Sequence, residues 1–457
     1  MHPQPIKLLI FVEHVSRELD VACVLKYLLL RRHGCSTEIA AINWDLSRTL
    51  KRFQPAVVAV PYCYSARPDD PGLAQMRAAW PRATWVNLAY EQVLQPINED
   101  FKVPRDAFAR HQVLHHAWGD FYADLLHRHG VSRPQILMNG NPTLALYQDP
   151  YRAYFESRTS LADRHGLNVR APWVFVPENY GAAFMSDRSF RDHVRRGYHA
   201  DQGRTYRQFA SASLREVIRW LQRLAETTEA EVIVRPRPMT PLAAFERVCR
   251  QAMGRGVVAR FHLIKNGTVR EWVLASDLVL SSYSTTLIEA AVAQRPVALL
   301  APLPFPGFVE AEWYGAVPRL DTFASLARFA TDHSWQDVSW PRLKAWAEAR
   351  MLSRGDPLAR LADLLNAVVS GDRPVALPED SREATASGEG DPAGAPPSWV
   401  TGSGRQLIAG LRVQWRQKIH ERLHERDRLS SADIDRRVAR WSEVLEAPTL
   451  ASVAAHA

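Results

Sequence analysis

The stretch Ala275–Pro302, ASDLVLSSYSTTLIEAAVAQRPVALLAP, decides the fold class of this chain. An apolar run, Leu278–Leu280, is followed by five hydroxyl side chains, then by a helical pattern and a second apolar run, Pro296–Leu300. Short apolar runs bounded by polar residues are typical of buried parallel strands. The stretch therefore predicts a strand, a helix and a second strand, with the hydroxyl cluster at the point where the first strand ends.

The same alternation of apolar runs and helical patterns extends to both sides of this stretch. In the first part of the chain the predicted strands are Lys7–Val12, Thr37–Ala41, Ala56–Pro61, Thr84–Leu88, Val113–Trp118 and Gln135–Met138. In the second part they are Trp173–Pro177, Ala230–Arg235, Phe261–Leu263, Leu278–Ser281 and Val297–Ala301. Helical patterns lie among them, for example at Asp20–His33, Ser211–Thr227 and Leu242–Met253. Alternating strands and helices predict parallel sheets, so we expect an α/β protein with two halves, residues 1–150 and 151–370.

The composition changes after residue 370. Residues 371–404 are rich in proline, glycine, serine and acidic side chains, which predicts a flexible linker. Residues 405–457 carry two helical patterns and are a predicted helical tail. An apolar stripe lies beside basic residues in the first pattern and consists of Ile408, Leu411, Trp415 and Ile419. We expect residues 405–426 to contact the anionic inner face of the cytoplasmic membrane, a partner protein, a second copy of the chain or the core of the chain itself.

Charge and cysteine content limit the classes of partner. The chain of 457 residues has a net charge of +8 and a sequence pI of about 9.4, which suits a partner that carries phosphate or carboxylate. Its sequence has no helix-turn-helix, zinc-finger or RNA-binding signature, so nucleic acid is not expected as a partner. The four cysteines form no C-x-x-C pair, which favours a reducing cytoplasm over a disulfide framework or a zinc site. The sequence also has no apolar run of about 18 residues that would predict a membrane-spanning helix.

The hydroxyl cluster predicts a phosphate-binding site in the second half. Ligands of parallel sheets bind at the carboxyl ends of strands, where serine and threonine offer donors without adding charge. Helix capping accounts for one or two such hydroxyls, but this cluster has Ser281, Ser282, Ser284, Thr285 and Thr286. Glu289 lies one turn inside the predicted helix, where its carboxylate is suited to a ribose hydroxyl.

A pair of arginines follows another strand of the second half. In EVIVRPRPMTP, Arg235 lies at the predicted strand end and Arg237 lies two residues beyond it. Guanidinium groups bind phosphate in a bidentate manner and stay charged, so both arginines are candidate phosphate ligands. The alternative is that they are two solvated arginines in a proline-rich turn.

Carboxylates gather at strand ends in the first half. Glu13 ends the first predicted strand, in LLIFVEHVSRELDV, and Arg17 and Asp20 follow it. A carboxylate at such a position can act as the general base on a sugar hydroxyl. The alternative is a salt-bridged helix start, in which Glu13 or Asp20 pairs with Arg17. Glu91, in WVNLAYEQVL, follows another strand and is a third candidate base.

Three motifs together resemble a known family. They are E-x-x-x-R-E-L-D at Glu13–Asp20, GNP at Gly140–Pro142 and SDLVLSSYSTTLIEAA at Ser276–Ala291. They are similar to motifs of bacterial surface carbohydrate biosynthesis proteins, which act in lipopolysaccharide or capsule assembly. The resemblance covers residues 5–365 and implies the GT-B fold, in which two Rossmann-like domains face a cleft. The serine-rich motif is shared more widely, with teichoic-acid glycerophosphotransferases, capsule 3-deoxy-manno-octulosonate transferases and bacterial GT-B sialyltransferases.

The resemblance implies a glycosyltransferase. Backbone amides, hydroxyls and arginines can neutralise its leaving phosphate, so neither a metal ion nor a cofactor is expected. Its donor would be a CMP-, CDP- or UDP-linked sugar in the second half, with Glu289 at the nucleotide. Its acceptor would be a glycan or a lipid-linked glycan at the first half, beside Arg17, with Glu13 or Asp20 as base if the reaction inverts. Such a protein would be cytoplasmic, with peripheral contact at the inner membrane.

The sequence departs from this family at one position. Arg237 stands in RPRP where relatives often have histidine, and arginine stabilises a leaving phosphate but does not donate a proton to it. Two other functions therefore stay open. One is the transfer of a polyol phosphate from a CDP-glycerol-type donor, and the other is a non-catalytic GT-B scaffold at the membrane.

Overall fold

The computed structural model describes residues 3–66, 70–100, 102–195, 197–254, 258–352, 355–372 and 427–447. The predicted linker from residue 373 onward, and the predicted basic helix within residues 405–426, lie outside these ranges. Among the described residues, no helix combines the length and the apolar character needed to cross a membrane.

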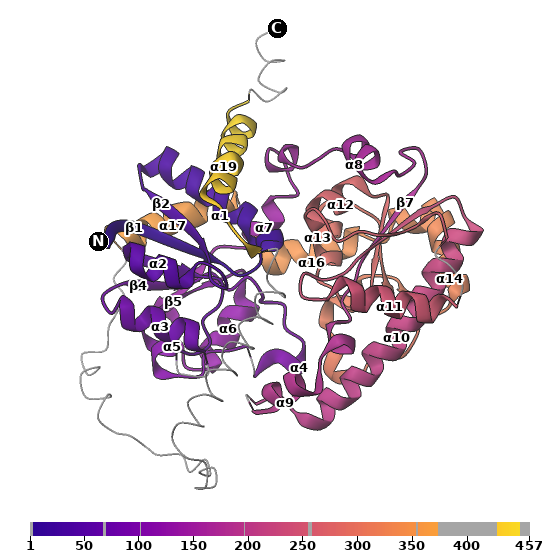
Figure 1. The fold of residues 1–457 in the computed structure, drawn as a ribbon, viewed down its shortest axis with the longest axis horizontal. Coiled ribbons are helices and arrows are strands. Elements are labelled where there is room, and N and C mark those ends of the chain that lie inside the picture. Colours follow the sequence, from indigo (N-terminus) through magenta and orange to yellow (C-terminus); the bar gives the residue numbers. More distant parts are fainter. Residues whose placement is uncertain are drawn as a thin grey trace, which may run out of the picture.

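The first half is a parallel sheet of six strands in the order β2-β1-β3-β4-β5-β6 (Figure 1). The strands are β1 (Gln4–Val12), β2 (Thr37–Ala41), β3 (Phe53–Val60), β4 (Thr84–Asn87), β5 (Val113–Ala117) and β6 (Ile136–Met138). The helices of this half are α1 (Val15–His33), α2 (Leu46–Arg52), α3 (Pro71–Ala79), α4 (Pro96–Glu99), α5 (Ala107–His111), α6 (Asp120–Arg128) and α7 (Pro142–Ala145). Nearly continuous apolar runs such as Leu8–Val12 form these strands because helices cover both faces of the sheet.

The second half is another parallel sheet of six strands, in the order β12-β11-β10-β7-β8-β9. The strands are β7 (Trp173–Pro177), β8 (Glu231–Arg235), β9 (Phe261–Leu263), β10 (Leu278–Ser281), β11 (Val297–Leu300) and β12 (Arg319–Leu320). The helices are α8 (Arg158–His165), α9 (Asp187–Arg195), α10 (Ala200–Thr227), α11 (Leu242–Met253), α12 (Val269–Ala275), α13 (Thr286–Val292), α14 (Phe323–Thr331), α15 (His333–Asp337) and α16 (Pro341–Met351). The sequence prediction of two parallel α/β halves is confirmed.

The chain returns to the first half after α16. The next helix, α17 (Pro357–Ser370), packs on α1, and its apolar face, which includes Leu358, Leu361 and Leu365, joins the core that contains β1 (Figure 1). The expected boundary of the second half at residue 370 therefore differs from the packing in the structure. No local sequence signal marks this crossing, because an amphipathic helix packs equally well on either sheet.

The last described helix, α19 (Ser431–Glu446), also packs on the first half, against α1 and the 3-10 turn at Tyr151–Tyr154 (Figure 1). Its Trp441 is fully buried and stacks on Tyr154 with ring centroids 3.8 Å apart. Ile434 is 6% exposed and belongs to the same core. This part of the expected helical tail is therefore packed into the core of the first half.

Candidate functional site

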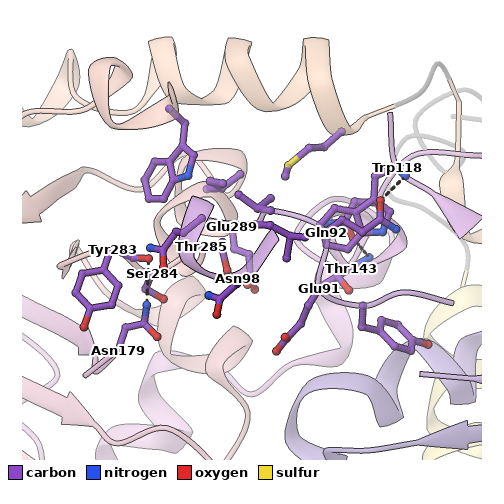
Figure 2. Close-up of a pocket in the computed structure, with 18 of the residues that line it drawn as sticks. Glu91, Gln92, Asn98, Trp118, Thr143, Asn179, Tyr283, Ser284, Thr285 and Glu289 are labelled. Atoms are coloured by element: carbon purple, nitrogen blue, oxygen red, sulfur yellow. Dashed lines mark hydrogen bonds between the residues drawn. The ribbon is translucent and has the colours of Figure 1, made fainter. Parts of the chain in front are cut away.

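The carboxyl ends of strands from both sheets converge on one cavity of about 210 Å³ between the two halves (Figure 2). The first half lines it with the start of α1, the loop after β4, and α4 and α7. The second half lines it with the segments after β7, β8 and β10 and with one face of α13. Figure 2 shows Ser284 and Thr285 on one side of this space and Glu91 on the other. A ligand in it would touch both halves.

In the second half, the cavity opens at the point where the strand order reverses. From β10 the chain continues to β11 and β12 on one side of the sheet, and from β7 it continues to β8 and β9 on the other side. The loops that follow two such neighbouring strands run in opposite directions and leave a crevice between them. Asn179 follows β7 and Thr285 follows β10, and both side chains line the cavity. Asn179 Nδ2 donates to the carbonyl oxygen of Tyr283 at 3.0 Å, which ties the two loops together.

Of the five hydroxyls of the cluster, two line the cavity and three do not. Ser284 and Thr285 line the cavity, and Thr285 is exposed there without making a side-chain cap hydrogen bond to α13. Ser284 Oγ donates to Thr286 Oγ1 at 3.1 Å and accepts from the Thr286 backbone N at 3.2 Å, so this pair caps the helix start. Thr286 itself does not line the cavity.

Ser281 and Ser282 lie behind the cavity and are used inside the sheet. Ser281 Oγ donates to the carbonyl oxygen of Pro177 at 2.6 Å, and Ser282 Oγ donates to that of Leu300 at 3.0 Å. Ser282 also hydrogen bonds to the hydroxyl of Tyr180. Both serines are 2% exposed, so the structure gives them a structural role where the sequence had predicted phosphate binding.

Arg235 and Arg237 point to different places, although both were expected at the same crevice. Arg237 lines the cavity and is exposed, and within the described part of the chain no group accepts a hydrogen bond from its guanidinium. Arg235 is 7% exposed, donates from Nη2 to the carbonyl oxygen of Gly267 at 2.8 Å and lines a different groove, beside α19. The backbone N of Arg237 donates to Glu178 Oε2 at 3.1 Å, which holds the turn that separates the two side chains.

On the side of the first half, Glu91 lies between two cations. Arg17 Nη1 donates to Glu91 Oε1 at 2.5 Å, and the Lys102 ammonium contacts the other carboxylate oxygen. All three side chains line the cavity. Lys102, followed by Arg17, holds the pKa of the Glu91 carboxyl well below its usual range, against the effect of burial. The Glu91 side chain is therefore ionised and orients two positive groups at the cavity wall.

Glu13 and Asp20, the other two candidate bases, do not line the cavity. Glu13 Oε2 accepts from Arg17 Nη2 at 3.1 Å, which is the salt-bridged helix start that the sequence left open. Asp20 is fully buried inside α1, where Arg270 Nη1 at 3.1 Å and Arg437 Nη1 at 2.8 Å occupy its two oxygens. Because α1 begins at Val15, Asp20 lies in the helix interior, where an acceptor hydroxyl has no access to it.

Glu289 lines the cavity from α13 and crosses to the first half. Its Oε2 accepts a hydrogen bond from the hydroxyl of Tyr147, and no described residue hydrogen bonds to its Oε1. Burial raises the pKa of the Glu289 carboxyl, and the charge of Arg270 lowers it in part. The pKa values of the two cavity carboxyls are therefore shifted in opposite directions: burial raises that of Glu289, and the neighbouring cations lower that of Glu91.

Several cavity residues were not singled out from the sequence. Lys102 belongs to a short irregular segment that carries no motif, as does Tyr147, which does not line the cavity but donates a hydrogen bond to Glu289. Carboxamides from both halves line the cavity, namely Gln92, Gln95, Asn98, Asn141 and Asn179. Asn141 Oδ1 accepts from the Thr143 backbone N at 2.9 Å and begins α7, so the GNP motif contributes to the cavity wall. The position of Asn179, directly after a strand of the second half, was the available signal for that residue.

No group of three or more His, Cys, Asp or Glu residues in the described ranges is arranged to hold a metal ion. The four cysteines are buried and unpaired.

Comparison with known proteins gives similarity at the level of structure. No protein-family model matches this sequence, and no curated protein matches it. A structure of the wall teichoic acid polymerase TagF with CDPG is 11% identical, covers 80% of this chain and 89% of its own, and has a TM-score of 0.52. The structure of S. aureus MnaA with UDP is 12% identical, the match covers 79% of this chain and 96% of MnaA, and the TM-score is 0.49. The structure of Anabaena HepE with UDP and glucose is 11% identical, the match covers 80% of this chain and 100% of HepE, and the TM-score is 0.44.

At this identity the similarity to TagF shows the fold and nothing more. The fold is GT-B, with two Rossmann-like halves that face a cleft, as the resemblance in the sequence implied.

Proposed function

We propose that this protein is a transferase that moves a sugar from a nucleotide-activated donor to a hydroxyl of a glycan or lipid-linked acceptor. The observation that carries the proposal is the distribution of charge in the cavity. The second half presents Arg237, whose guanidinium donates to no described residue although Glu178 and Glu91 lie near enough to feel its charge, whereas the first half presents Glu91 already paired with two cations. A guanidinium with unused N–H donors suits a phosphate, and a carboxylate already paired with cations suits a neutral hydroxyl.

In this proposal the second half holds the donor. Arg237 binds the phosphate adjoining the sugar, and the hydroxyl of Thr285 donates to another phosphate oxygen, as does that of Ser284 once it turns away from Thr286. Glu289 Oε1 accepts a hydrogen bond from a hydroxyl of the nucleotide-activated donor, which corresponds to the nucleotide contact expected from the sequence. When the bond between sugar and phosphate breaks, the electron pair leaves on the phosphate oxygen, and Arg237 stabilises that charge by position without giving up a proton.

The first half holds the acceptor. The Glu91 carboxylate accepts a hydrogen bond from the hydroxyl of the acceptor and takes its proton as the new bond to the sugar forms. A carboxylate that is paired with Arg17 and Lys102 is a weak base, so the proton moves late, after positive charge has developed on the sugar and made the hydroxyl more acidic. Closure of the two halves excludes water from this step, and no cofactor is needed.

A second candidate function is the transfer of a polyol phosphate, with attack at phosphorus. TagF, which shares the fold, is a wall teichoic acid polymerase and has been solved with CDPG. Three cations around one cavity, Arg17, Lys102 and Arg237, also suit a reaction at a phosphate group. In both cases we place the protein in the assembly of a bacterial surface polysaccharide, at the cytoplasmic side.

A thermal-shift screen against CMP, CDP, UMP, UDP, GDP and TDP tests the donor site. A nucleotide present at about 100 times its dissociation constant stabilises the folded state by about 2.7 kcal/mol. CMP binding would indicate an octulosonate or sialate donor, and CDP binding a polyol-phosphate donor. The expected result is a rise in the unfolding midpoint with one base, lost in Arg237→Ala and reduced in Thr285→Val.

Ser281→Ala is the matched control, because it removes a hydroxyl of the same cluster that bonds inside the sheet. This variant should unfold at a lower temperature and keep the nucleotide-induced shift. Glu289→Gln then separates two roles: a higher KM for the donor indicates a ligand of a donor hydroxyl, and a lower kcat at unchanged KM indicates proton transfer. The absence of a shift with every nucleotide would refute the proposal and favour the scaffold.

A further inference from the structure

The C-terminal segment of the described chain, residues 427–447, contacts the first turn of α1. Asp427 Oδ1 accepts a hydrogen bond from the backbone N of Val15 at 2.9 Å, and Asp427 Oδ2 lies 3.2 Å from His14 Nδ1. His14, the residue before α1, makes no side-chain cap hydrogen bond of its own. A helix start leaves backbone N–H groups without partners, and a carboxylate there stabilises the helix. In this chain the cap is supplied by a residue more than 400 positions away.

The same segment makes a second contact one turn further along α1. Asp20 Oδ1 accepts from Arg437 Nη1 on α19 at 2.8 Å, and Asp20 Oδ2 accepts from Arg270 Nη1 on α12 at 3.1 Å. The side chains of Asp20 and Arg270 are each 1% exposed, so their charges depend on each other. One buried carboxylate thus joins the first half, the second half and the C-terminal helix.

Arg17 lies between these two contacts on the same turn of α1. Its carbonyl oxygen accepts from Arg270 Nη2 at 2.6 Å, and its guanidinium reaches Glu91 in the cavity at 2.5 Å. Its other partners are Glu13 and Glu18, so the direction of its side chain depends on where the backbone of this turn lies. Neither Asp427 nor Arg437 lines the cavity itself.

We infer that residues 427–447 are a positioning element of the reaction site, with Asp427 and Arg437 as positioning residues that act through Arg17 on Glu91. The inference rests on the proposed function, because it assigns Glu91 to the acceptor. Asp427 fixes the start of the turn and Arg437 fixes its end, so the carboxylate of Glu91 keeps its direction towards the acceptor hydroxyl. Docking of the C-terminal helix is therefore required for turnover and not for holding the donor.

Kinetics of Asp427→Ala and Arg437→Gln in the full chain test this inference. We expect kcat to fall about fivefold to tenfold at an unchanged KM for the donor, since the loss of a cap weakens the turn and leaves the second half intact. Asp427→Asn keeps an oxygen for Val15 N, and Arg437→Lys keeps a cation for Asp20, so both should recover most of the activity. Arg436→Gln is the control on the same helix, because Arg436 is 73% exposed and pairs with Asp433.

Hydrogen exchange of the unligated protein gives a second readout that needs no turnover. We expect faster exchange of backbone amides in residues 13–18 and 88–95 of Asp427→Ala and Arg437→Gln, with no change in Arg436→Gln. Unchanged exchange in residues 88–95 would overturn the inference, as would unchanged kcat in variants with a lower unfolding midpoint. If no nucleotide shifts the unfolding midpoint, that result alone refutes the proposed function. Hydrogen exchange still decides whether the C-terminal segment positions Glu91.

Discussion

Replacement of Gly181 by alanine tests the donor site without removing any polar group. Gly181 begins the 3-10 turn Gly181–Phe184, and a Cβ placed on it would lie 2.5 Å from Arg237 Nη1. Ordinary van der Waals contact needs about 3.4 Å, so the guanidinium must move by roughly 1 Å. Gly181 is not among the glycines with positive φ, so alanine fits its backbone conformation. The far end of a flexible arginine is what moves, and the free energy of unfolding should change by less than about 0.5 kcal/mol.

The expected loss of affinity follows from the geometry of charged hydrogen bonds. Such a bond has a length of about 2.9 Å and is effectively lost when it is stretched by roughly 1 Å. Hydrogen bonds to charged groups contribute about 1.5–3 kcal/mol. Gly181→Ala should therefore raise the dissociation constant of the nucleoside diphosphate by about 10-fold to 150-fold, close to the effect of Arg237→Ala.

Isothermal titration calorimetry with the nucleotide selected by the screen measures this loss. Gly307→Ala is the matched control, because a Cβ on Gly307 meets nothing within 4 Å. The double variant Gly181→Ala with Arg237→Ala should bind as weakly as Arg237→Ala alone, since both changes act on one guanidinium. Wild-type affinity in Gly181→Ala, or losses that add in the double variant, would show that Arg237 does not contact the nucleotide.

Three further outcomes are expected. Glu91→Gln should lower kcat by about 10²-fold to 10⁴-fold at an unchanged donor KM, and steady-state kinetics with wild-type rates would exclude Glu91 as the base. Burial lowers the pKa of His115 and of His116 to about 4, below the value of about 6.5 in the unfolded chain. The stability that these imidazoles contribute is present above pH 6.5 and is lost as the pH falls towards 4, by about 3 kcal/mol each, and urea unfolding at pH 7.5 and 4.5 should show this decline. Trp441→Ala should cost about 3–5 kcal/mol in urea unfolding, because the indole is fully buried against Tyr154, and a smaller loss than about 1 kcal/mol would mean that α19 is not docked in solution.

The strands were predictable from the sequence because their side chains are buried on both faces. The run Leu278–Ser281 is nearly continuous in apolar residues and coincides with β10. β12 was missed because Arg319–Leu320 has two residues, one of them exposed, which is too short for any periodic signal. The start of α1 was placed at Asp20 and not at Val15, because its cap comes from Asp427, a contact that no local pattern records.

The candidate site was predictable at the level of strand ends and not at the level of side-chain direction. Arg235 and Arg237 share one turn, yet they line different spaces on either side of it. Ser281 and Thr285 belong to one hydroxyl cluster, yet the first bonds to a neighbouring strand and the second faces the cavity. A sequence shows where a parallel strand ends, but the carbonyl groups of neighbouring strands decide which hydroxyls remain available to a ligand.

Arg237, which stands where the resembled family often has histidine, is consistent with the proposed mechanism. A histidine at residue 237 would carry a proton to the leaving phosphate only while it is charged, whereas the guanidinium keeps its charge over the whole working range of pH. The remaining titratable groups of the cavity wall then set the dependence of the reaction on pH. Glu91 stays ionised because Lys102 and Arg17 hold its pKa well below the usual range, and Glu289 is the cavity carboxyl whose pKa burial raises. In the proposed mechanism the second half therefore supplies a permanent charge to the donor, and the first half supplies a carboxylate of fixed direction to the acceptor.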